Sequence, residues 1–347
     1  MTHRSNTQLR FLTLLVVFGL VVAVCARIAF ARSKAAPIGT GVVVIDTNLG
    51  YEESAAAGSG MVLTSSGEVL TNNHVIDGAT TIKVVVPGTD HRYTAHVVGY
   101  DKSADVALLS LQNASGLKTV SLGDSSKLSV GQAVKALGNA NGTGRLTPAP
   151  GTITGLGKSI VASDDEGSSE RLTGLIETNA GLIPGDSGGP LFDNAGHVIG
   201  MDTAASTSQG YAFQDVSSTA AFAIPIDKAV TLAKAIEGGR SSSTVHVGAT
   251  AFFGIRVEPA GESGGFGDVP ATGALIVGVV QGGPAAAAGL VAGDVVTAVA
   301  GKAVTTPTGL TSVVLAEKPG VKVGVSYVDQ AGEQQTATVT LGSGPPQ

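Results

Sequence analysis

Short runs of β-branched and aliphatic residues, each interrupted by glycine or an Asx turn, dominate the chain between about residues 37 and 239. Strands at such spacing, with no helical pattern between them, are typical of an antiparallel sandwich or barrel. The 49 glycines and 14 prolines fit many tight turns. The sequence therefore predicts a mostly β fold. The runs are GVVVID (41–46), GMVLT (60–64), TIKVVV (81–86), TAHVVGY (94–100), DVALLSL (105–111), QAVKALG (132–138) and HVIGM (197–201).

The pattern changes at IDKAVTLAKAIE (226–237), where good helix formers are followed by two glycines. Glycine just beyond such a run is a common helix stop, so we expect a helix that ends the first domain. GGRSSS (238–243) has the composition of a flexible linker, and GSGPPQ at the end that of a disordered tail. The predicted organisation is a targeting segment (1–36), a first domain (37–237), a linker (238–247), a second domain (248–342) and a tail (343–347).

The first 36 residues have the order of an export signal. Arg4 and Arg10 precede the charge-free stretch FLTLLVVFGLVVAVCA (11–26). As a helix this stretch would reach about 24 Å, slightly less than a hydrocarbon core of about 30 Å. Ala29-Phe30-Ala31 has the small-x-small pattern of a cleavage site, whereas the long apolar run suits an uncleaved anchor. A cleaved signal peptide and a membrane anchor, formed as an N-terminal hydrophobic helix, both stay open.

Charge and cysteine content exclude some classes of protein. The net charge is −6, and the first 36 residues hold five basic residues and no acid, so the remainder is more acidic still. An acidic body argues against a nucleic-acid partner. Because Cys25 is the single cysteine, no intramolecular disulfide can form.

The most specific string is GDSGGP (185–190). A serine between glycines suits nucleophilic catalysis, because the hydroxyl must be exposed and backbone N–H groups must converge where a substrate oxyanion forms. The alternative is an ordinary turn, since all four residue types favour turns.

Two further residues support catalysis. His74 lies in TNNHVI and Asp105 in ADVALL; each alone is more simply a packed histidine or a turn aspartate. Together with Ser187 they follow the order His, Asp, Ser, which is that of the chymotrypsin-type triad.

TNNHVI, ADVALL and GDSGGP resemble the corresponding segments of the HtrA (Deg) family of trypsin-like serine proteases, and FAIP (222–225) resembles another family string. The resemblance covers about residues 37–342. It implies a chymotrypsin-like double β-barrel with the triad His74, Asp105 and Ser187 in the cleft, and an oxyanion hole formed by the N–H groups of Gly185 and Ser187. It implies no metal and no organic cofactor, and the sequence has no HExxH motif or cysteine cluster.

Two positions depart from relatives. Many HtrA proteins carry GNSGGP, whereas Asp186 here matches secreted trypsins. The position that forms the base of the specificity pocket in trypsin, an aspartate there, is Gly181 here. We therefore expect small or medium apolar P1 residues in place of Lys or Arg.

The second domain contains GGPAAAAGL and AGDVVTAVAGKAV, which resemble the PDZ domain of HtrA proteases. Such a domain captures a peptide C-terminus as an added strand, with loop amides on the carboxylate. The resemblance implies that Phe253, Gly254 and Ile255 form that loop and that about 308–316 form the helix beside the groove. TVHVGATAFFGI (244–255) is similar to the secreted PepA-type proteases of mycobacteria and their relatives.

The sequence leaves two alternative functions open. The first is an active endopeptidase, extracytoplasmic and either membrane-anchored or secreted, that degrades unfolded or damaged proteins in the cell envelope. The second is a chaperone or PDZ-led adaptor whose protease fold is silent at rest. The intact triad favours the first. The expected partners are unfolded protein or peptide substrates, C-terminal peptides at the PDZ groove and, if the first segment is retained, a membrane. HtrA relatives are often trimers or larger, which makes a homo-trimer the first assembly to test.

Overall fold

The computed structural model describes residues 37–51, 53–89, 91–163, 169–205, 220–261 and 272–347. The expected N-terminal hydrophobic helix lies outside these ranges. Within the ranges that the structure covers, no helix is both long and apolar enough to cross a membrane.

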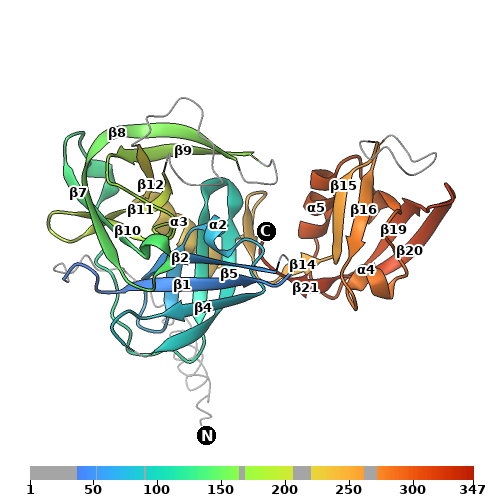
Figure 1. The fold of residues 1–347 in the computed structure, drawn as a ribbon, viewed down its shortest axis with the longest axis horizontal. Coiled ribbons are helices and arrows are strands. Elements are labelled where there is room, and N and C mark those ends of the chain that lie inside the picture. Colours follow the sequence, from blue (N-terminus) through green and yellow to red (C-terminus); the bar gives the residue numbers. More distant parts are fainter. Residues whose placement is uncertain (1–36, 52, 90, 164–168, 206–219, 262–271) are drawn as a thin grey trace, which may run out of the picture. The chain divides into compact units, whose positions relative to one another are not determined.

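The first half of the predicted first domain (37–237) is a six-stranded antiparallel barrel (Figure 1). Its strands follow the order β5-β4-β1-β2-β3-β6, and a β5–β6 pairing closes it. Its interior is filled by aliphatic side chains such as Ile45, Val69 and Leu109, all fully buried. Short helices α2 and η1 connect strands at one end. The bounds are β1 Val42–Leu49, β2 Ser54–Val62, β3 Glu68–Thr71, α2 Asn73–Ile76, β4 Thr81–Val85, β5 Arg92–Asp101, η1 Lys102–Ala104 and β6 Val106–Leu111.

A second closed antiparallel barrel follows, in the order β10-β11-β12-β9-β8-β7. Its core is again aliphatic, with Ile153, Ile176 and Leu191 almost completely buried. The resemblance-based expectation of a double barrel is therefore confirmed. The bounds are η2 Ser125–Lys127, β7 Ala133–Gly138, η3 Ala140–Gly142, β8 Thr147–Ser163, β9 Ser169–Thr178, β10 Pro190–Asp193, β11 Val198–Ala205 and β12 Ala221–Pro225.

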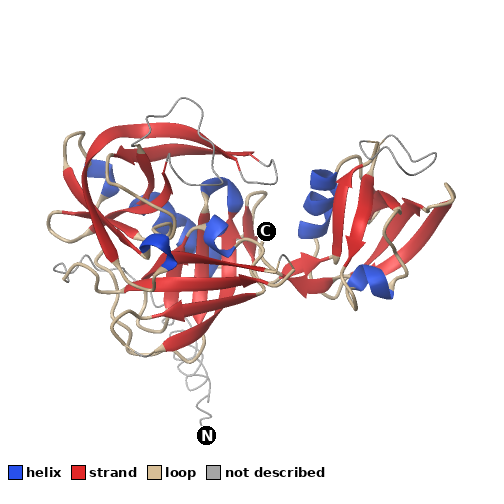
Figure 2. Cartoon of the chain, viewed as in Figure 1, coloured by secondary structure: helices blue, strands red, loops and turns tan. Residues whose placement is uncertain are grey.

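Helix α3 spans Ile226–Glu237, the range that the sequence predicts. Its buried residues include Ile226, Ala229, Ala233 and Ile236, which recur at helical spacing and form one apolar face. Figure 2 shows that helices are few and that strands dominate the fold.

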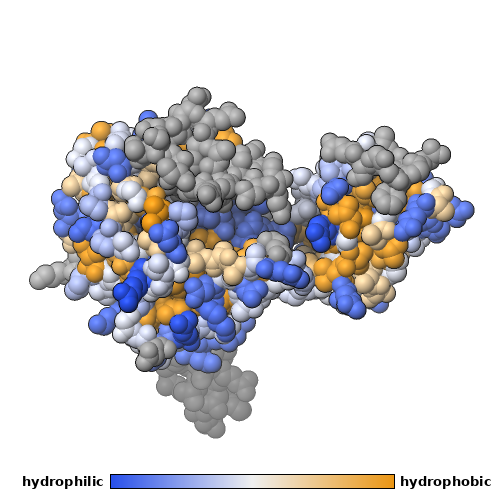
Figure 3. All heavy atoms as spheres, viewed as in Figure 1, coloured by the Kyte–Doolittle hydropathy of each residue, from blue (hydrophilic) through white to orange (hydrophobic). Residues whose placement is uncertain are grey.

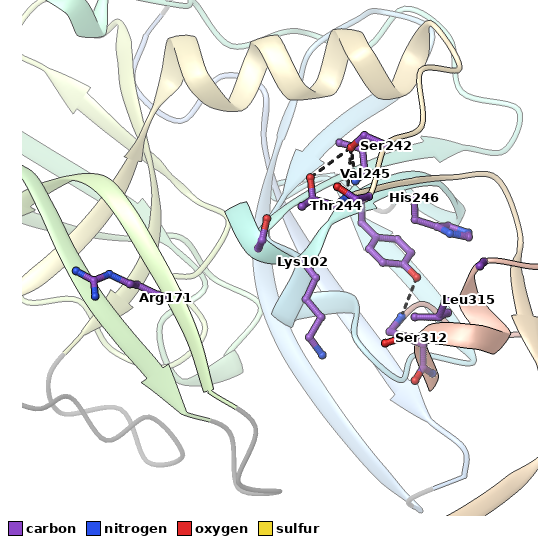
Figure 4. Close-up of a pocket in the computed structure, with 13 residues that line it drawn as sticks. Lys102, Arg171, Ser242, Thr244, Val245, His246, Ser312 and Leu315 are labelled. Atoms are coloured by element: carbon purple, nitrogen blue, oxygen red, sulfur yellow. Dashed lines mark hydrogen bonds between the residues drawn. The ribbon is translucent and has the colours of Figure 1, made fainter. Parts of the chain in front are cut away.

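The expected linker is partly ordered. Val245–Val247 forms β13 and pairs with β5 of the first barrel. Ser242 Oγ accepts hydrogen bonds from the N–H groups of Thr244 (3.2 Å) and Val245 (3.0 Å), as Figure 4 shows. His246 stacks on Tyr100 with ring centroids 5.0 Å apart. Composition did not reveal this strand, because β13 forms only where β5 offers an edge.

The second domain is built on a sheet in the order β15-β16-β17-β19-β20, with β18 beside β17. Its core includes Ile276, Val296, Val325 and Val339, all nearly inaccessible. A separate pair joins β14 to β21. The bounds are β14 Thr250–Phe252, β15 Ile255–Pro259, β16 Ala274–Val279, α4 Pro284–Ala287, β17 Val295–Val299, β18 Lys302–Ala303, α5 Pro307–Leu315, β19 Lys322–Val328, β20 Gln334–Thr340 and β21 Gly342–Gly344.

The tail differs from the disordered segment expected for 343–347. Gly342–Gly344 pairs with Thr250–Phe252, and Pro345 and Pro346 are buried. Glycine and proline content predicts disorder, but Gly344 leaves room for the Phe252 side chain, since a Cβ at Gly344 would lie 2.5 Å from Phe252 Cβ and 2.7 Å from its ring. A close approach of this kind is a use of glycine that composition alone does not reveal.

The visible surface carries hydrophobic and hydrophilic residues side by side (Figure 3). Single exposed aliphatic residues such as Val130 and Val291 are ordinary on a protein surface.

Candidate active site

His74 and Asp105 lie in direct contact at one end of the first barrel. His74 belongs to α2, and its Nδ1 lies 3.0 Å from Asp105 Oδ1 and 2.9 Å from Oδ2. The His74 backbone N–H also donates to Asp105 Oδ1, at 3.0 Å. With Nδ1–H donated to the carboxylate, the imidazole lone pair is on Nε2. The carboxylate therefore orients the ring and selects its tautomer.

The backbone at Asp105 aims its side chain at His74. Asp105 ends the 3₁₀ turn η1 with a left-handed conformation (φ 53°), and its N–H donates to Lys102 O at 3.0 Å. Asn72 Nδ2 donates to Asp105 O at 2.9 Å. Aspartate tolerates a positive φ better than most residues, which explains why the turn accepts it. Asp105 is only 4% exposed.

Thr203, in β11 of the second barrel, joins the predicted nucleophile to this pair. Thr203 Oγ1 donates to Asp105 Oδ2, and Thr203 O accepts a hydrogen bond from Ser187 Oγ at 3.3 Å. The structure thus gathers His74, Asp105 and Ser187 around one threonine. Sequence reasoning missed Thr203, because a threonine in a β-run carries no distinguishing signal.

The loop that carries Ser187 packs too closely on its surroundings for side chains at its glycines. A Cβ at Gly185 (φ 98°) would lie 2.2 Å from Asn139 O, and one at Gly188 (φ 82°) would lie 2.2 Å from Ser59 O. Such distances exclude any other residue without backbone movement. The glycines of GDSGGP therefore let the loop lie against both barrels, while Ser187 itself stays partly accessible.

Two buried carboxyl groups, Asp186 and Asp202, lie close enough to interact electrostatically. Asp186 Oδ2 accepts from Ile183 N at 3.0 Å, while its Oδ1 and both oxygens of Asp202 are buried with no hydrogen-bond partner among the described residues. Burial raises the pKa of Asp186 to about 6. Burial, and secondarily the nearby Asp186, raises the pKa of Asp202 well above its usual value.

Gly181 lies on the segment leading into the nucleophile loop and is exposed. A Cβ built on it would meet nothing within 4 Å. The residue predicted to shape the specificity pocket thus presents neither charge nor bulk, and the space beside it is open.

In the second domain, Phe253, Gly254 and Ile255 lead into β15, which forms an edge of its sheet among the described strands. Phe253 is buried, and its carbonyl accepts from Ala285 N at 3.0 Å. Gly254 has a φ of 81°, and its carbonyl accepts from Val280 N at 2.9 Å. With one carbonyl held by α4 and the other by the residue that follows β16, the loop has a fixed backbone next to a sheet edge.

Within the described residues, no group of three or more His, Cys, Asp or Glu side chains is placed to hold a metal ion.

The chain matches two protein families. Residues 58–201 match the trypsin-like peptidase domain, and residues 251–341 match the PDZ domain. The first match lies within the double barrel, and the second covers the sheet that carries β15.

Similarity over most of this chain agrees with the two matches. The chain is 34% identical over 319 residues to serine protease PepD of Mycobacterium tuberculosis, covering 89% of this chain and 65% of PepD. It is 34% identical over 296 residues to a probable periplasmic serine endoprotease, DegP-like, of Halomonas elongata, covering 85% of this chain and 58% of that protein. The chain thus spans less than two thirds of these relatives. The solved HtrA-type protease AlgW with a tripeptide is 29% identical, with a TM-score of 0.50, covering 92% of this chain and 98% of AlgW.

The narrower resemblance to PepA-type proteases stays a prediction. With a trypsin-like peptidase domain, a PDZ domain and similarity to these relatives over most of its length, the chain belongs to the HtrA/DegP-like family of trypsin-like serine proteases with a PDZ domain.

Proposed function

We propose that this chain is a serine endopeptidase that hydrolyses peptide bonds in unfolded or damaged extracytoplasmic proteins. The observation that carries the proposal is the His74–Asp105 pair at 2.9 Å, linked through Thr203 to Ser187. A buried carboxylate, an oriented imidazole and a partly accessible serine are the parts that acyl transfer needs.

The proposed reaction has two halves. Ser187 Oγ attacks the scissile carbonyl carbon while His74 Nε2 takes its proton, and Asp105 stabilises the imidazolium. His74 then gives that proton to the leaving amine as the C–N bond breaks, which leaves an acyl-enzyme on Ser187. Water attacks the ester by the same route, and the acid product and free Ser187 result. The Ser187 Oγ hydrogen bond to Thr203 O is long, at 3.3 Å, so turning the hydroxyl toward His74 costs little.

The negative oxygen of each tetrahedral intermediate would be bound by the N–H groups of Gly185 and Ser187. These two donors flank Asp186 on the tight loop, and Gly185 has the positive φ that glycine adopts readily. We place the protein outside the cytoplasm, because its DegP-like relatives are named periplasmic. Whether the first 36 residues are cleaved or anchor the chain is a further part of this proposal.

We expect residues 37–347 to degrade unfolded casein and Ser187→Ala to leave casein intact. Asp105→Asn should reduce kcat about 10⁴-fold, because the wrong histidine tautomer would face the serine. Gel assays with an active-site serine reagent check both points. Folded substrate protein and heat-inactivated enzyme are the controls. Casein degradation that persists in Ser187→Ala would contradict the proposal, and an inert parent that suppresses aggregation would favour the binding function.

We expect a peptide with Val at P1 to be cleaved faster than the same peptide with Arg, because Gly181 brings no carboxylate to the pocket. Gly181→Asp is the matched variant, since its Cβ enters open space. It should gain cleavage at Arg by at least about tenfold, because a pocket carboxylate sets preference for basic P1 residues. Comparison of kcat/KM for both peptides tests this. A parent enzyme that prefers Arg refutes the pocket assignment.

We also propose that the PDZ domain binds peptide C-termini along β15, with amides of Phe253, Gly254 and Ile255 on the carboxylate. The edge position of β15 supports strand addition. Peptides with a free C-terminus should bind Ser187→Ala protein at least about tenfold more tightly than the same peptides amidated, measured by fluorescence anisotropy. Equal affinities of the free and amidated peptides would argue against carboxylate capture.

The raised pKa of Asp186 predicts a pH dependence of stability. At pH values between about 4 and 6, folded Asp186 keeps a proton that the unfolded chain has lost, so stability falls as pH rises, by up to about 1.4 kcal/mol per unit. Asp186→Asn cannot ionise and can still accept from Ile183 N. Both proteins carry Ser187→Ala, which prevents self-digestion. The Tm of Asp186→Asn, relative to that of the protein with Asp186, should therefore rise from pH 4 to pH 7.5. If this difference in Tm stays constant with pH, the pKa of Asp186 is not raised by folding.

A further inference from the structure

Ser59 of β2 is completely buried, yet its hydroxyl bonds only to the opposite barrel in the contacts that the structure gives. Ser59 Oγ donates to Gly185 O at 2.8 Å and accepts from Asn139 N at 2.8 Å. Gly185 precedes the predicted nucleophile by two residues, and Asn139 follows β7. One hydroxyl of the first barrel therefore fixes two backbone segments of the second.

The backbone of Ser59 holds the other side of the same loop. Ser59 N donates to Ser187 O at 2.8 Å, and Ser59 O accepts from Thr71 Oγ1 at 2.7 Å. Ser59 thus bonds to the carbonyls of Gly185 and Ser187, the two residues whose N–H groups form the proposed oxyanion hole.

The peptide before Gly185 is held by the turn η3, which begins directly after Asn139, the second residue that Ser59 Oγ binds. Asn141 N, in the turn η3, donates to Pro184 O at 2.7 Å. In a trans peptide the C=O and N–H point in opposite directions, so the Gly185 N–H points away from η3. The carbonyl of Gly185 itself is held by Ser59. Both peptides that flank Gly185 are therefore fixed by groups outside the loop.

Glycine makes this restraint necessary. Gly185 has a φ of 98° and, lacking a Cβ, can reach alternative conformations that would turn its N–H away. Without the Ser59 hydroxyl, Gly185 O and Asn139 N would each lose this hydrogen-bond partner, and a buried polar group without a partner destabilises the arrangement that buries it. A peptide rotation that re-satisfies them would then compete with the present arrangement.

We propose that Ser59 is a positioning residue that holds the Gly185 N–H in the oxyanion hole. At 0% exposure it cannot touch substrate, and it acts through Gly185. The inference rests on the proposed endopeptidase function and concerns the same site.

The test compares Ser59→Ala with the parent enzyme on a peptide substrate and on a peptide boronic acid, whose tetrahedral adduct places an oxygen where the oxyanion forms. Removing one oxyanion donor outright costs about 10²–10³-fold in kcat, so a misplaced one should cost about 10–100-fold. We expect KM to stay within about twofold and boronate affinity to fall by the same factor as kcat/KM. Ser59→Thr, which keeps the hydroxyl, should recover most of the loss.

Thr47→Val is the matched control, because it removes a buried hydroxyl of the same barrel that donates to Ala56 O at 3.2 Å, away from the loop. It should leave kcat and boronate affinity unchanged. If Ser59→Ala does not fold by circular dichroism, Ser59→Cys, with similar shape and a weak donor, replaces it. If Ser59→Ala binds the boronate as tightly as Thr47→Val does, the proposed role of Ser59 is wrong and the proposed endopeptidase function still stands. A parent that cleaves no substrate overturns the proposed function and this role with it.

Discussion

The close backbone contact between β2 and the 185–189 loop is the constraint on which the site depends. Gly188 lies so near Ser59 O that a Cβ would be 2.2 Å from it, and Ser59 N bonds to Ser187 O at 2.8 Å. Because β2 belongs to the first barrel and the loop to the second, the nucleophile is positioned by the packing of one barrel on the other. His74 and Asp105 come from the first barrel, and Ser187 and Thr203 from the second. Any change that loosens the contact would therefore separate the proposed base from the proposed nucleophile.

Three buried aspartates near this contact differ in their hydrogen-bond partners. These partners decide which protonation state of each carboxyl group is favoured. Asp105 accepts from the His74 backbone, the His74 ring and Thr203, all of which stabilise its charge. Asp202 has no partner for either oxygen among the described residues, and burial raises its pKa. Asp186 is intermediate, with one bond from Ile183 N. The hydrogen bonds at Asp105 thus favour a carboxylate beside His74, whereas burial at Asp202 favours the protonated carboxyl group. A second full charge here would compete with Asp105 for the developing imidazolium.

Local patterns made much of the fold predictable. The β-branched runs became strands, and the helix formers before two glycines became α3 over Ile226–Glu237. GDSGGP, TNNHVI and ADVALL located the residues that meet around Thr203. What the sequence could not reveal depends on contacts between distant segments: Ser59 and Gly185 are 126 residues apart, and Thr203 and Asp105 are 98 apart. A serine or threonine in a β-run carries no local sign of such a partner. The ordered ends of the linker and the tail were missed for the same reason, because β13 and β21 form only where β5 and β14 offer an edge.

The distribution of polar groups explains why a site of this kind lies between barrels and not within one. The hydrophobic core of each barrel is almost wholly aliphatic, so its side chains offer no hydrogen-bond partner for a hydroxyl, an imidazole or a carboxylate. The facing ends supply carbonyls, turn N–H groups and polar side chains such as Asn72, which bonds to Asp105 O at 2.9 Å. Some hydroxyl groups buried there, such as those of Ser59 and Thr203, bond across the contact, and each such bond ties the geometry of the proposed site to barrel packing. A hydroxyl such as that of Ser59 can therefore matter for catalysis although it never meets the substrate.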